Sequence, residues 1–111
     1  MALERARTQH IVVMAAAGDD TTSWDTQCRH RENGLVEVGT HYVIYQNGDV
    51  ENHRAHAQHG NLHPKYNADA VFVEVITQTG EMNEAQAAAA DGLVEYLQET
   101  YLEAEPVFML T

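Results

Sequence analysis

The strongest limit on the fold of this chain is a nearly continuous apolar run, AVFVEVI, at residues 70–76. Its β-branched and aromatic residues favour a β-strand. A strand that is apolar at successive positions, instead of alternate ones, is usually buried on both faces. The run therefore predicts a central strand in a sheet that other elements cover on both sides.

Further strands are predicted on either side of this run. Residues 10–15, HIVVMA, are a second β-branched apolar segment and indicate another buried strand. Residues 40–46 and 49–53 flank Asn47-Gly48, the dipeptide most typical of tight hairpin turns. We therefore expect these two segments to pair as a hairpin. Residues 107–110 predict a short last strand.

A first helix is predicted between the first strand and the hairpin. Thr22 or Ser23 can cap its N-terminus through the side-chain hydroxyl. Gly34 would end it, because glycine readily adopts the left-handed conformation that follows a helix. Trp24 and Cys28 are four residues apart, so we expect them to share the inner face of this helix. Cys28 is the only cysteine, which excludes an internal disulfide and a cysteine-rich metal site.

A second helix is predicted over residues 84–102. Asn83 can cap it, and Gln86 lies three residues further on, which completes a capping box. Apolar side chains recur every fourth residue along the helix and predict its buried stripe. The members of this stripe are Ala85, Ala89, Leu93, Leu97 and Tyr101.

Together these elements predict an α/β fold with a mixed central β-sheet flanked by helices, in the order β-α-β-β-β-α-β. The chain has 111 residues, of which 44% are apolar. This length and composition match one packed globular unit. We therefore expect residues 1–111 to form a single domain.

The charge composition limits the partners that the chain can bind. There are 17 acidic residues against 6 Lys and Arg, for a net charge of −11. Nucleic-acid binding needs clustered cations, so this acidic protein is not expected to bind nucleic acid. A basic protein partner would suit it. No apolar stretch is long enough for a membrane span, and the N-terminus lacks a signal-peptide pattern. We expect no membrane association, no secretion by a signal peptide, and a location inside a cell or in a particle built there.

Five short segments carry a resemblance to a known family: residues 30–34 (HRENG), 38–44 (VGTHYVI), 47–51 (NGDVE), 66–67 (YN) and 83–86 (NEAQ). Their order and spacing resemble those of the type-2 N-acetylmuramoyl-L-alanine amidases. Bacteriophage amidase-type lysozymes and peptidoglycan recognition proteins share that fold. The similarity covers about residues 9–110 and is greatest to the phage branch, which implies a location in a phage virion or the host cytoplasm.

The resemblance implies a zinc site that this chain does not reproduce. Active members hold zinc with a histidine at the end of the first strand and two ligands after the last strand, and a tyrosine assists catalysis. The resemblance assigns Met14 to the first ligand position and Thr40 to the tyrosine. The sequence ends at Thr111, about where the second histidine ligand would begin. We therefore expect a pseudoenzyme with no catalytic residues, no bound metal and no cofactor.

Four histidines are the remaining metal-site candidates. Their spacings of three, three and four residues would place them on one face of a helix, where they could bind a metal. Gly60 and Pro64 lie among them and favour a solvated polar loop instead. The loop is our prediction, and the metal site is the alternative. The four candidates are His53, His56, His59 and His63.

Other polar residues have simpler interpretations. His41 matches a family histidine at the start of the second strand, and we expect it to be partly buried and hydrogen-bonded. We predict no functional role for His10 or His30. Glu74 interrupts the central apolar run. It either faces solvent at a sheet edge or meets a cation of a partner protein, and the sequence does not favour one over the other.

Three functions follow as hypotheses. The first is a catalytically inactive structural or scaffolding component of a larger assembly, such as a phage virion, with other protein chains as its partners. The second is a non-enzymatic regulator that binds a protein such as phage RNA polymerase, as the resemblance to phage lysozymes implies. The third is a zinc-dependent peptidoglycan amidase that uses the histidine-rich loop.

Overall fold

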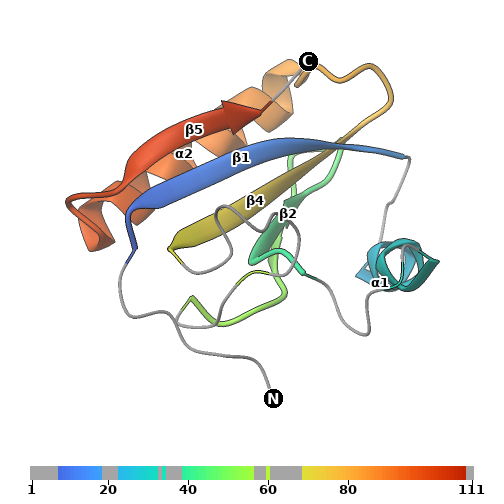
Figure 1. Cartoon of the computed structure of the whole chain (residues 1–111). Coiled ribbons are helices and arrows are strands. Elements are labelled where there is room, and N and C mark those ends of the chain that lie inside the picture. The colour runs from blue at the N-terminus through green and yellow to red at the C-terminus, as the bar shows by residue number, and fades with distance from the viewer. Residues whose placement is uncertain are drawn as a thin grey trace.

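The computed structural model of the chain describes residues 8–18, 23–32, 34, 39–56, 60 and 69–109 (Figure 1). The predicted α/β class and element order are confirmed in these ranges. None of the helices described is long and apolar enough to cross a bilayer. The elements are β1 (His10–Ala17), α1 (Ser23–Glu32), β2 (Tyr42–Ile44), β3 (Val50–Asn52), β4 (Ala70–Thr77), α2 (Glu84–Thr100) and β5 (Glu105–Met109).

The strands form one five-stranded mixed sheet in the order β3-β2-β4-β1-β5. β1 pairs in parallel with β4 and β5, β2 pairs in parallel with β4, and β2 and β3 are antiparallel. β4 lies in the middle, and all of its residues are buried. The unbroken apolar run at residues 70–76 is therefore the central strand, as predicted.

The hairpin between β2 and β3 is also confirmed, although both strands are shorter than predicted. The Gly48 N–H donates to the Tyr45 carbonyl at 2.9 Å, and the Tyr45 N–H donates to the Asp49 carbonyl at 2.9 Å. Gly48 has φ = +91°. This left-handed conformation suits glycine, which has no Cβ to clash. Asn47 supports the turn by accepting a hydrogen bond from the Asp49 N–H.

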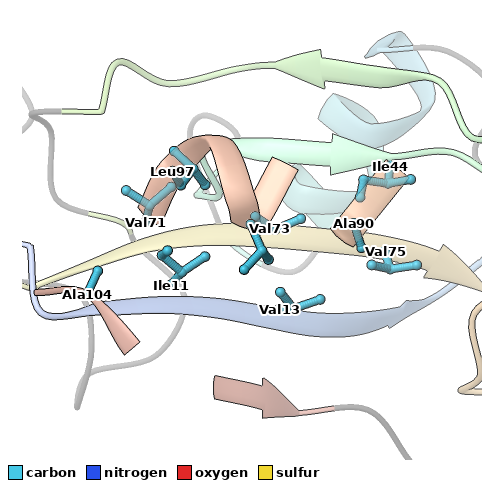
Figure 2. Close-up of a cluster of buried hydrophobic side chains, with 10 residues drawn as sticks. Ile11, Val13, Ile44, Val71, Val73, Val75, Ala90, Leu97 and Ala104 are labelled. Atoms are coloured by element: carbon cyan, nitrogen blue, oxygen red, sulfur yellow. The ribbon is translucent and has the colours of Figure 1, made fainter. Parts of the chain in front are cut away.

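One face of the sheet packs against α2 and is called the α2 face. In Figure 1, α2 lies behind the strands. The predicted capping box is present, with Asn83 and Gln86 exchanging hydrogen bonds. The predicted inward stripe is wrong in part, because Ala85 is exposed and the buried positions lie about one residue further on. Figure 2 shows much of this core, whose buried members are Ile11, Val13, Ile44, Val71, Val73, Val75, Ala90, Val94, Leu97 and Ala104.

The opposite face of the sheet carries the alternate side chains and is called the α1 face. Its apolar part includes Val12, Ala70 and Phe72, with Met14 packed against them. The Phe72 ring occupies the space that a side chain at Gly60 would need, so that position accommodates only a hydrogen atom.

The prediction for the inner face of α1 is wrong. Trp24 is 61% exposed, whereas Thr26 and His30 are buried. The face of α1 that packs against the rest of the protein therefore carries the polar side chains of Thr26 and His30, and Trp24 lies outside it. Cys28 is half-buried.

Candidate functional site

The site that the resemblance indicates lies on the α1 face, around Met14. In the strand register Met14 is the partner of Glu74 in β4 and of Met109 in β5. Register partners on parallel strands point to the same face of a sheet. Met14 is half-buried, Glu74 is buried, and Met109 is 39% exposed. A carboxylate and two thioethers therefore form a row across three neighbouring strands.

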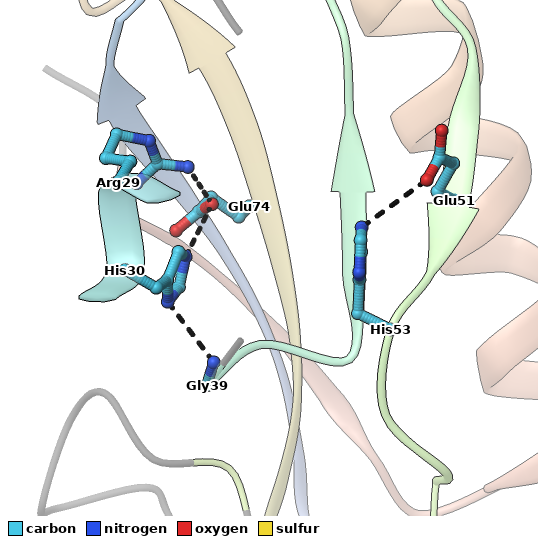
Figure 3. A network of polar contacts seen from close by, with 6 residues as sticks. All are labelled: Arg29, His30, Gly39, Glu51, His53 and Glu74. Carbon is cyan, nitrogen blue, oxygen red and sulfur yellow. Dashed lines mark hydrogen bonds and ion pairs between the residues drawn. The ribbon is translucent and has the colours of Figure 1, made fainter. Parts of the chain in front are cut away.

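Glu74 connects this row to α1 (Figure 3). Its Oε1 accepts a hydrogen bond from Arg29 Nη2 at 2.5 Å and lies 3.2 Å from His30 Nε2. The Gly39 N–H donates to the other ring nitrogen of His30, Nδ1, at 3.2 Å. Because Nδ1 accepts a hydrogen bond, the proton of the neutral ring lies on Nε2 and is donated to Glu74. We call Glu74, Arg29 and His30 the Glu74 cluster.

The Glu74 cluster keeps its carboxylate ionised. Burial alone would raise the pKa of Glu74, because a charge loses its hydration in the interior. The hydrogen bonds from His30 and Arg29, together with the Arg29 charge, outweigh burial and hold the pKa of Glu74 below its ordinary value. Glu74 is therefore an anion at neutral pH whose Oε1 is already engaged by its own chain.

This result corrects two interpretations of the sequence. Glu74 lies in the central strand, not at a sheet edge, and its cation comes from α1 and not from a partner protein. His30 is also not incidental, since it is buried and contacts Glu74. A carboxylate within an apolar strand and an adjacent Arg-His pair elsewhere in the chain are a signal that could have indicated this buried ion pair.

A second histidine lies beside the Glu74 cluster without being bonded to it. His53 Nε2 is 3.6 Å from Glu51 Oε2, beyond hydrogen-bond distance (Figure 3). This nitrogen is buried and has no hydrogen-bond partner. Burial lowers the pKa of His53, although the carboxylates of Glu51 and Glu74 act in the opposite direction. His53 is therefore mainly neutral at pH 7.

The candidate metal histidines do not converge in the part of the chain that the structure describes. His53 lies near Glu51 and the Glu74 cluster. His56 instead contacts the Tyr42 hydroxyl, and its ring lies 6.0 Å from that of Tyr101, beside the α2-face core. No helix includes residues 53–56, in agreement with the predicted loop. The other two candidates, His59 and His63, lie outside the described residues.

Tyr42, the partner of His56, belongs to a small group of aromatic side chains. Burial raises the pKa of Tyr42, and the neighbouring phenols of Tyr96 and Tyr101 add to that effect. The Tyr42 hydroxyl therefore remains protonated at neutral pH and can donate to His56. This contact supports a structural role for His56.

Two other family positions are also buried. His41 is fully buried, and its Nδ1 accepts a hydrogen bond from the Phe72 N–H at 2.9 Å. The expected hydrogen bond is therefore confirmed, whereas the expectation of partial burial is wrong because no part of His41 is exposed. Thr40, at the position that the resemblance assigns to the catalytic tyrosine, is buried, and its hydroxyl has no hydrogen-bond partner.

The residues around Met14 do not fit the zinc ion that the family implies. Zinc in such sites is held by imidazole, thiolate or carboxylate groups, and a thioether is a poor ligand for it. Glu74, the carboxylate beside Met14, has Oε1 engaged by Arg29 and His30. Among the described residues no three His, Cys, Asp or Glu side chains lie close enough together to hold a metal ion.

The fold is shared with solved structures of amidases and recognition proteins. An endolysin of a Thermus scotoductus bacteriophage is 20% identical with a TM-score of 0.85, over 96% of this chain and 75% of that one. Drosophila peptidoglycan recognition protein SD is 18% identical with a TM-score of 0.83, over 97% and 73%. The amidase LysC of Clostridium intestinale is 19% identical with a TM-score of 0.77, over 94% and 70%.

No curated protein sequence matches the chain. A family profile, in contrast, agrees with the structural comparison. The profile of the N-acetylmuramoyl-L-alanine amidase family matches residues 4–108, almost the whole sequence. This chain therefore belongs to the N-acetylmuramoyl-L-alanine amidase family.

Proposed function

We propose that this chain is a non-catalytic member of its family, which acts by binding other proteins as a structural component of a larger assembly such as a phage virion. The observation that carries the proposal is the environment of Met14. The position assigned to the first zinc ligand holds a thioether, and the carboxylate next to it belongs to a buried ion pair.

This environment lacks the chemistry of a metal-dependent amidase. A catalytic zinc needs three protein ligands and an open position for water. The metal then supplies hydroxide at neutral pH and polarises the scissile carbonyl. Met14 cannot replace an imidazole in that role, and freeing Glu74 to bind a metal would break its buried contacts with Arg29 and His30. Breaking a buried ion pair is unfavourable.

The protein surface supports a binding role. A net charge of −11 favours a basic partner surface through long-range attraction. A fold that has lost its catalytic groups can still present a stable surface, because function depends on sites and not on the fold. The endolysin with the same fold is a phage protein, which supports a phage assembly as the setting.

Metal and peptidoglycan assays test the non-catalytic part of the proposal. The purified chain is dialysed against Zn²⁺, its metal content is measured, and release of peptides from peptidoglycan is followed. The Thermus phage endolysin provides the positive control. We expect well under one zinc per chain and no release. One tightly bound zinc per chain with peptide release would instead establish the amidase alternative.

Fractionation of phage-infected cells tests the binding part. We expect antibodies against the chain to detect it in purified particles, together with capsid or tail proteins. Recovery with RNA polymerase, and absence from particles, would replace the structural role with the regulatory one. Recovery as a free monomer in every fraction would contradict both binding roles.

A further inference from the structure

Two methionines lie on the α1 face, on the neighbouring strands β1 and β5 (Figure 1). Met14 and Met109 are register partners, so their side chains leave the sheet on the same side. Met14 is half-buried and packs against the apolar cluster that includes Phe72. Met109 is 39% exposed. One thioether is therefore shielded by apolar groups, and the other is accessible from solvent.

We propose that Met14 and Met109 form a binding site for a soft monovalent cation, Cu(I) or Ag(I), with the two thioether sulfurs as its ligands. This inference does not rest on the proposed function, because it concerns only this pair of side chains. It agrees with the poor fit of zinc to the same residues, since zinc takes imidazole, thiolate or carboxylate ligands. It departs from the expectation, drawn from the sequence, that the chain binds no metal.

The spacing of the two strands suits a pair of sulfur ligands. Neighbouring strands in a sheet lie about 4.8 Å apart. Two metal–sulfur bonds of about 2.3 Å, the length found between zinc and a thiolate, span about 4.6 Å when they are in line. A methionine side chain has three rotatable bonds, so both sulfur atoms can adjust to one ion without a change in the backbone. The register of β1 and β5 therefore allows both thioethers to reach the same ion.

The chemistry of the two side chains selects the ion. A thioether is a soft donor, which favours Cu(I) over Mg²⁺, Ca²⁺ and Zn²⁺. Ag(I) has the charge and the closed d shell of Cu(I), and it needs no reducing agent, so it serves as a probe for the same site. A thioether also carries no proton that a metal must displace, unlike a thiol or an imidazolium. Binding to this pair should therefore not depend on pH.

Glu74 is not a ligand of the proposed site. It is the register partner of Met14 in β4, but its Oε1 contacts Arg29 and His30. Both proposed ligands are neutral, so the bound ion adds one positive charge to the α1 face. The net charge of −11 favours the approach of a cation to the chain. The site therefore needs no carboxylate of its own.

NMR of the full chain, with isotope-labelled methionine methyl groups, tests the site directly. The sequence has four methionines, and Met82, which packs against the α2-face core, is the internal reference. On titration with Ag(I) we expect the methyl signals of Met14 and Met109 to shift together while that of Met82 stays in place. A shift of only one member of the pair, or of neither, would overturn the proposal.

Leucine variants measure the part that each sulfur plays. Cu(I) affinity is determined under reducing conditions by competition with the chelator bicinchoninate. Met14→Leu and Met109→Leu keep the apolar volume, so both should fold. Each should weaken binding by at least about tenfold, because each removes a ligand. Met82→Leu is the matched control and should bind as wild type; equal affinities in all three variants would contradict the proposal.

The thiol of Cys28 is the main competitor, because it is also a soft ligand. The titrations are therefore repeated with Cys28→Ser. In this variant we expect the Met14 and Met109 shifts to persist, to be complete at one Ag(I) per chain, and to show the same affinity from about pH 8 to pH 5, where histidine ligands would be protonated. Loss of these shifts, or an affinity that falls with pH, would assign the ion to the thiol or to histidines and overturn the proposal.

Discussion

The two faces of the same sheet are stabilised by different kinds of interaction. On the α2 face, valine, isoleucine and leucine side chains are buried together with α2 (Figure 2). On the α1 face, the helix is held by a carboxylate, a guanidinium and an imidazole (Figure 3). Apolar burial is non-directional and insensitive to pH, whereas an ionic cluster depends on geometry and protonation. One sheet therefore packs against one helix through apolar side chains and contacts the other through charged and polar ones.

The largest expected loss of stability comes from a substitution on the α2 face. Leu97 is fully buried in the α2-face core. Leu97→Ala removes its contacts and leaves a cavity, so it should lower the free energy of unfolding by about 2–5 kcal/mol. Urea denaturation measures this change. Leu102→Ala, at a position that is 87% exposed, is the matched control and should change stability by no more than about 0.5 kcal/mol. Equal effects of the two substitutions would contradict the assigned core.

On the α1 face, removing Glu74 alone should lower the free energy of unfolding more than removing both Glu74 and Arg29. Glu74→Ala removes the anion that Arg29 and His30 both contact, and since Arg29 is 19% exposed we expect a loss of about 2–3 kcal/mol, below that of a fully buried pair. The double variant Glu74→Leu with Arg29→Met removes both charges and should be closer to wild type. A double-mutant cycle by urea denaturation measures the coupling. Additive losses would show that the two charges do not interact.

Acid should weaken the α1 face in two steps. The pKa values of His53 and Glu74 are lowered from ordinary values of 6.5 and 4.5. The unfolded chain therefore binds these protons at higher pH than the folded chain, so both contributions to stability are complete above those values and decrease as the pH falls. Urea denaturation across pH 8 to 3 should show a first decrease below about 6.5 and a second below about 4.5.

The variant His53→Gln separates these steps. The substituted side chain cannot be protonated. The decrease in the free energy of unfolding that begins near pH 6.5 should therefore be smaller, while the decrease below pH 4.5 remains. His10→Gln, which changes a histidine on the far side of β4 from the β2–β3 hairpin, is the control for a general loss of histidine. An unchanged first decrease in His53→Gln would assign that step to another group.

The smallest expected effect concerns the start of α2. The Asn83 side chain accepts a hydrogen bond from the Gln86 N–H at 2.9 Å. Asn83→Ala leaves that donor without its cap and should lower stability by about 1 kcal/mol. Asn83→Asp keeps an acceptor and should lose less. Thermal unfolding of the three proteins compares them, and an equal loss in both variants would exclude the cap as the cause.

The sequence predicted the features that depend on neighbouring residues. The capping box needs only Asn83 and Gln86, and the hairpin needs only Asn47 and Gly48, so both follow from local spacing. The central strand was evident because a strand covered on both faces has no polar alternation. The class and order of the fold could therefore be predicted without any long-range contact.

The features that were mispredicted depend on residues far apart in the chain. The partners of Glu74 come from α1, and spacing along one strand does not reveal which helix covers it. The apolar pattern predicts Trp24 on the inner face of α1, because apolar side chains usually point inward, but here His30 is buried on that face and contacts Glu74. Tertiary electrostatics overrode the local apolar preference.

The parallel pairing of β1 also affects how the protein is made. β1 pairs with β4 on one side and with β5 on the other, and both are synthesised much later than β1. Its apolar segment therefore has no pairing partner on the ribosome until most of the chain has emerged. Folds with such distant pairings form slowly, and unpaired strands of this kind are prone to aggregate. Production of this protein should thus benefit from chaperones that shield β1 until its neighbours arrive.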